Sequence, residues 1–149
     1  MTTKSLLILA AKEDMEIKQW DVKSAFPNAP LDEEIYVEQP LGFIDPKFPN
    51  KVCKLNKALY GLKQAARQWY QHLLSIVYEI GFIHIPSDQS VFYNSITKII
   101  ITSHIDDLLI FGSDIMAINE LKFGLSQHVE ISDLGDVSFY LDMTIIRNR

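Results

Sequence analysis

Two adjacent aspartates, Asp106 and Asp107, interrupt an otherwise apolar stretch that runs from residue 101 to residue 113. A carboxylate in apolar surroundings is costly unless it is protonated or partnered, so an adjacent pair calls for a reason. A third acid, Asp21, lies near the end of a predicted strand. If that strand neighbours the aspartate pair, three carboxylates converge, and a cation between them would relieve their repulsion. Such hard oxygen ligands suit Mg²⁺, and two Mg²⁺ ions about 4 Å apart support nucleotidyl transfer.

Each of these acids also has an ordinary structural interpretation. An Asp-Asp pair suits a solvated turn, and Asp21 alone is an ordinary acid at the end of a strand. Two-residue hairpin turns favour Asn-Gly or Asp-Gly, so turn geometry does not select Asp106 and Asp107. The residue types leave both interpretations open, because the convergence depends on the fold.

Residue patterning predicts the elements that would position these acids. Strand 16–22 places Trp20 and Val22 on its core face and Asp21 on the other face. Strands over 90–111 have turns at 94–98 and at the two aspartates, which therefore form a hairpin tip. The other predicted elements are a buried helix over 6–11, short strands over 35–38 and 51–55, a helix beginning at Ser113 or Asp114, and an alternating strand over 138–146.

A long amphipathic helix is the clearest predicted element. Apolar residues from Leu62 to Ile80 recur at steps of three and four residues, between Gly61 at the start and Gly81 at the end. The order of elements predicts an α+β fold in which helices pack on one face of an antiparallel sheet, with a small β-hairpin beside it.

Composition limits the classes of protein that fit. The chain has 149 residues, 48% of them hydrophobic and 22% charged, which predicts one globular domain over residues 1–149. Its single cysteine, Cys53, allows no internal disulfide and favours a reducing compartment. The net charge of −5 argues against a surface that attracts nucleic acid everywhere, although a local basic groove remains compatible with it. We find no targeting signal and no apolar run near the ~20 residues of a membrane span.

Five segments, in order, resemble the reverse transcriptase of copia-type LTR retrotransposons over nearly the whole chain. The segments are DVKSAFPNAPLDEEIYVEQPLGF, VCKLNKALYGLKQAARQWY, SDQSVFYN, HIDDLLIFGS and DLGDVSFYLDMTI. This resemblance implies the palm of a right-hand polymerase, with Asp21, Asp106 and Asp107 as the catalytic and metal-binding triad. Asp21 and Asp106 would hold both Mg²⁺ ions, with Mn²⁺ as an alternative, while Asp107 would contribute less and the carbonyl of Val22 would add a ligand.

The same resemblance implies roles around the nucleotide. Phe26 falls at the steric gate that excludes a 2′-hydroxyl, and Gly61 and Gln64 fall at the nucleotide pocket. Lys63 and Arg67 would meet template or nucleotide phosphates. The structural alternatives are a core aromatic for Phe26, a helix start for Gly61 and a solvated helix face for Lys63 and Arg67.

The chain departs from the family pattern at several positions. His104 replaces a tyrosine, and in a strand ending at Asp106 it would share the face of that aspartate and touch the primer or pair with a carboxylate. The alternative for His104 is a partly buried histidine with a satisfied hydrogen bond. The other departures are Pro27, Ala29, Ala66 and Asp142, the last of which stands where the family has glycine.

The implied reaction is attack by a primer 3′-hydroxyl on the α-phosphate of a dNTP, directed by an RNA or DNA template. We expect the fingers, thumb and RNase H segments of a longer polyprotein to be missing here, and the family works in cytoplasmic virus-like particles. Two alternatives remain. One is a catalytically inactive palm that acts as a binding or interaction module. The other is a nucleotide cyclase, against which the chain offers no Gly-Gly-Asp/Glu-Glu-Phe-like hairpin.

Overall fold

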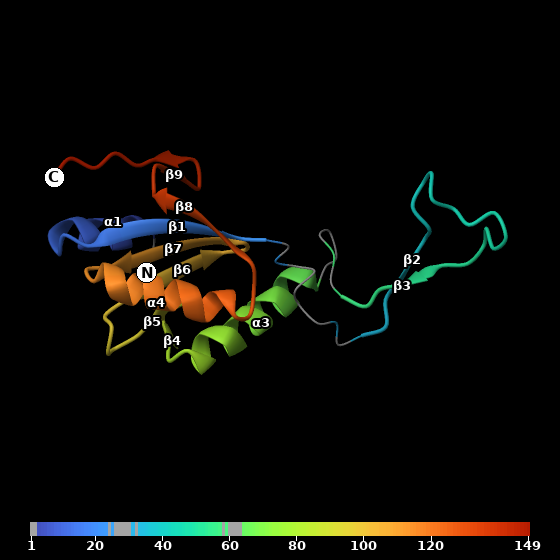
Figure 1. Ribbon diagram of the computed structural model, residues 1–149, viewed down its shortest axis with the longest axis horizontal. Helices are drawn as coiled ribbons and strands as arrows, with labels where there is room; N and C mark the ends of the chain where they lie inside the picture. The colour runs from blue at the N-terminus through green and yellow to red at the C-terminus, as the bar shows by residue number, and fades with distance from the viewer. Residues whose placement is uncertain (1–2, 24, 26–30, 32, 58, 60–63) are drawn as a thin grey trace.

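A six-stranded antiparallel sheet forms the centre of the molecule (Figure 1). The computed structural model describes residues 3–23, 25, 31, 33–57, 59 and 64–149. The sheet order is β4-β5-β6-β7-β1-β8, so the first strand of the chain lies between two late ones. The strands are β1 (Glu16–Val22), β4 (Ile83–Ile85), β5 (Asp88–Tyr93), β6 (Ile100–His104), β7 (Asp107–Gly112) and β8 (Ile131–Asp136).

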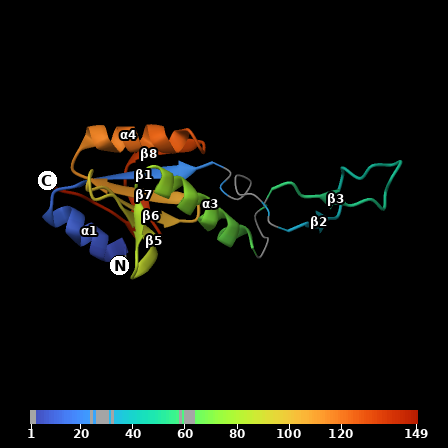
Figure 2. The same cartoon turned by 90° about the horizontal axis from the view of Figure 1, so that it is seen from below.

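Helices cover both faces of this sheet (Figure 2). α3 (Ala65–Glu79) and α4 (Ile115–Ser126) pack on the face that carries Trp20 and Leu108, whereas α1 (Thr3–Lys12) packs on the face that carries Ile17. The predicted α+β class with an antiparallel sheet is confirmed. The expectation that helices occupy one face only is wrong, because the central strands are apolar on both sides and α1 buries the second side.

The strand β7 shows why two covering layers are needed. Leu108, Leu109, Ile110 and Phe111 are all buried, with at most 1% of each side chain exposed. Successive residues of a strand point to opposite faces, so such a run requires a core on each side. A strand of this kind fits the interior of the sheet, where β7 pairs with both β6 and β1.

The helix α3 begins at Ala65 and buries the predicted apolar stripe, which includes Trp69, Leu73 and Ile76. Its predicted start at Gly61, together with Leu62 and Lys63, lies outside the described residues. The predicted end is confirmed, because Gly81 follows the helix with a φ of +90°. The helix α4 begins after Asp114, whose side chain accepts hydrogen bonds from two backbone N–H groups of the first turn.

Two small hairpins lie outside the main sheet among the described residues. β2 (Tyr36–Val37) pairs with β3 (Cys53–Lys54), as predicted, in an arm that extends away from the sheet (Figure 1). The predicted single strand over 138–146 is wrong, because these residues form β9 (Phe139–Tyr140) and β10 (Met143–Thr144). Leu141 and Asp142 both have positive φ, which is typical of a two-residue type I′ turn.

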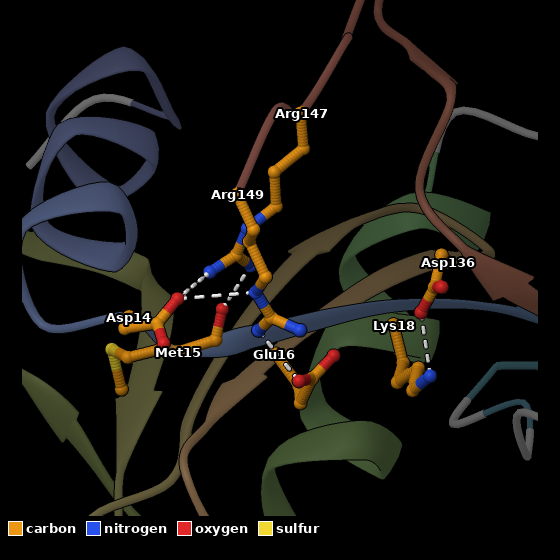
Figure 3. Close-up of polar contacts among 7 residues, drawn as sticks. All are labelled: Asp14, Met15, Glu16, Lys18, Asp136, Arg147 and Arg149. Carbon is orange, nitrogen blue, oxygen red and sulfur yellow. Dashed lines mark hydrogen bonds and ion pairs between the residues drawn. The ribbon is translucent and has the colours of Figure 1, made fainter.

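The C-terminal residues are fastened to the beginning of β1 by arginine contacts (Figure 3). Arg147 donates to Asp14 at 2.7 Å and to the carbonyl of Met15, while Arg149 donates to Glu16 at 2.6 Å. The hydrogen bond from Arg147 and the charge of Arg149 hold the pKa of Asp14 below its usual range. These contacts keep the segment that follows β10 against the face covered by α1.

No helix in the described part of the chain has the length and apolar character needed to cross a membrane. This agrees with the absence of a long apolar run in the sequence.

We predict that Gly81→Ala destabilises the fold by about 1–2 kcal/mol, because alanine is strained at this positive φ. A Cβ at this position would also lie 3.3 Å from Nδ2 of Asn94. The matched control is Gly124→Ala inside α4, where a Cβ would meet Ile80 at an ordinary 3.6 Å. The free energy of unfolding of that control is expected to rise by about 0.5–1 kcal/mol, because alanine has a higher helix propensity than glycine. Urea unfolding measures both changes, and shifts of the same sign would contradict this account.

Candidate active site

The pairing of β1 with β7 brings the three predicted acids to one end of the sheet. Asp21 is directly opposite Asp107 in this register, so the two side chains leave the sheet on the same face. The backbone N–H of Val22 donates to the carbonyl of Asp106 at 2.8 Å. The end of β1 is therefore joined to the aspartate hairpin, by which we mean β6, its turn and β7, residues 100–112.

The tip of the aspartate hairpin is one residue earlier than predicted. His104 pairs with Asp107, which leaves Ile105 and Asp106 as the two turn residues. Ile105 has a φ of +57°, whereas Asp106 is not among the positive-φ residues, and this is the pattern of a type II′ turn. The prediction that Asp106 and Asp107 form the tip is wrong because the strained position falls on Ile105. Asp107 is instead the first residue of β7.

The same shift corrects the position of His104. It was predicted to share the face of Asp106, but the strand register sets it opposite Asp107. The His104 side chain is exposed, and its charge acts to lower the pKa of Asp107. The predicted alternative of a partly buried histidine does not fit this exposed position.

The acids influence one another electrostatically. Burial, followed by the charges of Asp106 and Asp21, raises the pKa of Asp107 above its usual range. Lys23 lies 3.6 Å from a carboxylate oxygen of Asp21 and offsets part of the local negative charge. The fold thus places like charges near each other, an arrangement that is unfavourable without a cation.

The chemistry of these donors fits a divalent metal, since carboxylate oxygens are the ligands that Mg²⁺ prefers. Their side chains do not form a preassembled cage, because no group of three or more Asp, Glu, His or Cys side chains in the described residues is arranged to hold a metal ion. The strand register and the backbone hydrogen bond from Val22 to Asp106 nevertheless bring the three acids to one end of the sheet.

The remaining predicted site residues are distributed differently. Gln64 donates to a carboxylate oxygen of Glu33 at 3.0 Å, and Arg67 is exposed on α3. Phe26, Gly61 and Lys63 lie outside the described residues, as do Pro27 and Ala29. Among the residues that the structure describes, neither Gln64 nor Arg67 forms a hydrogen bond or ion pair with Asp21 or Asp107.

Tyr140 is a residue near the site that the sequence did not indicate. Its side chain is only 2% exposed, and its hydroxyl has no hydrogen-bond partner among the described residues. Burial and the charge of Asp107 raise the pKa of Tyr140 to about 12. The prediction of one strand over 138–146 put Tyr140 on the polar side. The glycine that the family has at the position of Asp142 was the signal for a turn there.

Comparisons with known proteins agree with the resemblance in the sequence. The family model for reverse transcriptase (RNA-dependent DNA polymerase) matches residues 2–149. The chain is 43% identical over 149 residues to the retrovirus-related Pol polyprotein from transposon TNT 1-94 of Nicotiana tabacum, covering 98% of this chain and 11% of the relative. It is 40% identical over 138 residues to the retrovirus-related Pol polyprotein from transposon RE1 of Arabidopsis thaliana, and this match covers 91% of this chain and 9% of the relative.

A yeast relative is shorter. The chain is 34% identical over 127 residues to a putative transposon Ty5-1 protein of Saccharomyces cerevisiae, covering 84% of this chain and 41% of the relative. The chain thus spans about a tenth of the length of the two plant polyproteins and less than half of this yeast protein.

We predict that Asp107→Asn stabilises the metal-free protein at pH 7, with a Tm increase of about 1–2 °C in the presence of a chelator. The pKa of Asp107 is raised in the folded state. Its favourable contribution to the free energy of unfolding is therefore present below the usual pKa of 3.8 and is lost as pH rises through the folded-state pKa. The gain should therefore shrink as the pH falls towards 3.8. Thermal unfolding across this range is the measurement.

Asp136→Asn provides a control of opposite sign on β8, which lies on the other side of β1 from β7. Lys18 donates to Asp136 and lowers the pKa of that carboxylate. The contribution of Asp136 to the free energy of unfolding is therefore present above pH 3.8 and is lost as pH falls through the lowered pKa. This variant should lower the Tm slightly at pH 7. An Asp107→Asn variant that is no more stable than the unaltered chain at pH 7 would contradict the proposed repulsion.

Proposed function

The chain belongs to the reverse transcriptase (RNA-dependent DNA polymerase) family of copia-type retrotransposons, and we propose that it is the catalytic palm of an RNA-directed DNA polymerase. Residues 1–149 would form this single domain. The strongest structural support is the β1–β7 register, in which Asp21 lies opposite Asp107 and beside the turn that carries Asp106. The function is nucleotidyl transfer to a primer on an RNA or DNA template.

Asp21, Asp106 and Asp107 are the catalytic acids of this proposal. Asp21 and Asp106 would each hold both of two Mg²⁺ ions, Asp107 would contribute less, and the carbonyl of Val22 would add one ligand. Bound Mg²⁺, or Mn²⁺ in its place, supplies activation of the attacking 3′-hydroxyl and stabilisation of charge on the leaving pyrophosphate. The primer 3′-hydroxyl would lose its proton to a surrounding water as its oxygen attacks the α-phosphorus of the dNTP, and the bond from that phosphorus to pyrophosphate would break.

The raised pKa of Asp107 supports this assignment. Burial and, after it, the charges of Asp106 and Asp21 disfavour the charged form of Asp107, and a bound cation would lower the pKa of Asp107 again. Asp21 and Asp107 belong to central strands, and Asp106 lies in the turn directly before β7, so the sheet restricts the backbone positions of all three acids.

The nucleotide and nucleic-acid contacts are proposed from the family resemblance. Phe26 would exclude a 2′-hydroxyl, and Gly61 and Gln64 would line the nucleotide pocket. A nucleotide at Gln64 would compete with its hydrogen bond to Glu33. The side chains proposed to contact template or primer are those of Lys63, Arg67 and His104.

The relatives named above are Pol polyproteins of which the matching segment is a small part. We therefore propose that fingers, thumb and RNase H segments of a longer polyprotein cooperate with this palm. The net charge of −5 leaves most of the phosphate binding to those segments. The proposed setting is the virus-like particle in the cytoplasm, which rests on the family alone.

Asp106→Asn is expected to reduce primer extension on an RNA template by more than about 100-fold, because it removes a metal ligand. Removing a residue that only hydrogen-bonds to a metal ligand already costs up to about 100-fold in activity. Primer extension and Mg²⁺ titration calorimetry measure the effect. Asp136→Asn is the matched control, since it removes an exposed carboxylate paired with Lys18 and should leave extension unchanged. Activity that survives Asp106→Asn would refute the assigned site. An unaltered chain that neither binds Mg²⁺ nor extends a primer would instead be an inactive palm.

Phe26→Ala is expected to increase ribonucleotide incorporation relative to deoxynucleotide incorporation by about tenfold or more, because a steric pocket discriminates by that order. Competing incorporation of dNTP and rNTP is the measurement. Phe43→Ala removes an exposed ring on the arm and serves as the control. Unchanged sugar selectivity in Phe26→Ala would exclude Phe26 as the steric gate.

A further inference from the structure

We propose that Trp69 is a positioning residue that fixes the orientation of Asp106 by holding the turn of the aspartate hairpin. The indole Nε1–H of Trp69, in α3, donates to the carbonyl of Ile105 at 2.6 Å. Trp69 is 2% exposed and belongs to the core between the sheet and α3. The catalytic consequence of this contact rests on the proposed function, whereas the contact itself concerns only the hairpin.

The turn needs an external contact because Ile105 is strained. A β-branched residue at a φ of +57° is a conformational outlier that persists only when its surroundings impose it. Its side chain is 43% exposed, so burial of the isoleucine provides only part of the compensation. Hydrogen bonds to the backbone of the turn are a further source of stabilisation.

Two such hydrogen bonds hold the peptide groups on either side of Asp106. Trp69 holds the carbonyl of Ile105, which belongs to the peptide group before Asp106. The N–H of Val22 holds the carbonyl of Asp106, which belongs to the peptide group after it, at 2.8 Å. Peptide groups are planar, so fixing both of them fixes the direction in which the Asp106 side chain leaves the backbone. α3 and β1 thus each hold one of the two peptide groups.

The other tryptophan shows that this contact is not a general property of buried indoles here. Trp20 is 1% exposed in the same core, and its Nε1–H has no acceptor among the described residues. The core therefore accommodates an indole for its apolar surface alone. Trp69 differs because its N–H group lies at the turn that carries an acid of the candidate site.

Trp69→Phe retains an aromatic ring in the core but removes the donor to Ile105. Amide hydrogen exchange of Val22 should then be about fivefold faster, because loss of a net hydrogen bond loosens the turn to which Val22 is bonded. The amide of Asn94, bonded to Ile99 at the other hairpin turn, should exchange as before. In primer extension we expect kcat to fall about tenfold or more through misorientation, with KM for dNTP unchanged.

Two further variants separate positioning from packing. Phe82→Leu replaces a buried aromatic ring of the same core with a smaller side chain and leaves the turn unaltered. The exchange rate of the Val22 amide should then be unchanged after correction for global stability. Ile105→Gly relieves the strain, since glycine is the preferred first residue of a type II′ turn. Added to Trp69→Phe, it should restore slow exchange at Val22. A tryptophan that only fills the core would not be rescued in this way.

The outcomes distinguish this inference from the proposed function. Unchanged exchange at Val22 in Trp69→Phe, equal acceleration in Phe82→Leu, or no rescue by Ile105→Gly would each overturn the role of Trp69. Faster exchange with unaltered kcat in an active enzyme would also overturn it as a positioning residue. If the unaltered chain has no polymerase activity, the proposed function fails, and the exchange measurements still decide whether Trp69 holds the turn.

Discussion

The antiparallel register of β1 and β7 is the constraint on which the candidate site depends. It places Asp21 directly opposite Asp107, although like charges in that relation destabilise a sheet. The same register places Trp20 opposite Leu108, and both are buried in the core under α3 and α4. Because a shift of one residue would move these apolar side chains to the wrong face, the core maintains a pairing that the acids oppose.

The two faces of the sheet contribute differently to this arrangement. On the face of α3 and α4, the core residues hold the strands in register, and Trp69 reaches the turn of the aspartate hairpin. On the face of α1, Tyr140 from the β9–β10 hairpin is buried close enough to Asp107 for that charge to raise the pKa of the tyrosine. The arginine contacts of Arg147 then fasten the segment after β10 near the start of β1. The acids therefore sit at the end of a sheet that is closed on both sides.

The local pattern of the sequence predicted many elements correctly. β1 has its predicted bounds, and the apolar stripe of Trp69, Leu73 and Ile76 is buried as its spacing indicated. The errors occur at turns. Alternating apolar residues look alike in one strand and in a tight hairpin, so the turn at Leu141 and Asp142 was missed. The turn at Ile105 was misplaced because isoleucine is disfavoured at positive φ, and only surrounding contacts impose it.

The sequence by itself determined the residue types, the helices, most of the strands and the family, since these depend on local periodicity and on ordered motifs. Only the tertiary structure decided which residues meet. The pairing of Asp21 with Asp107, the approach of Tyr140 and the contact between Trp69 and Ile105 all join distant parts of the chain. Such contacts follow from strand register and from the packing of α3, whose free energies are summed over the whole core rather than encoded in any local stretch.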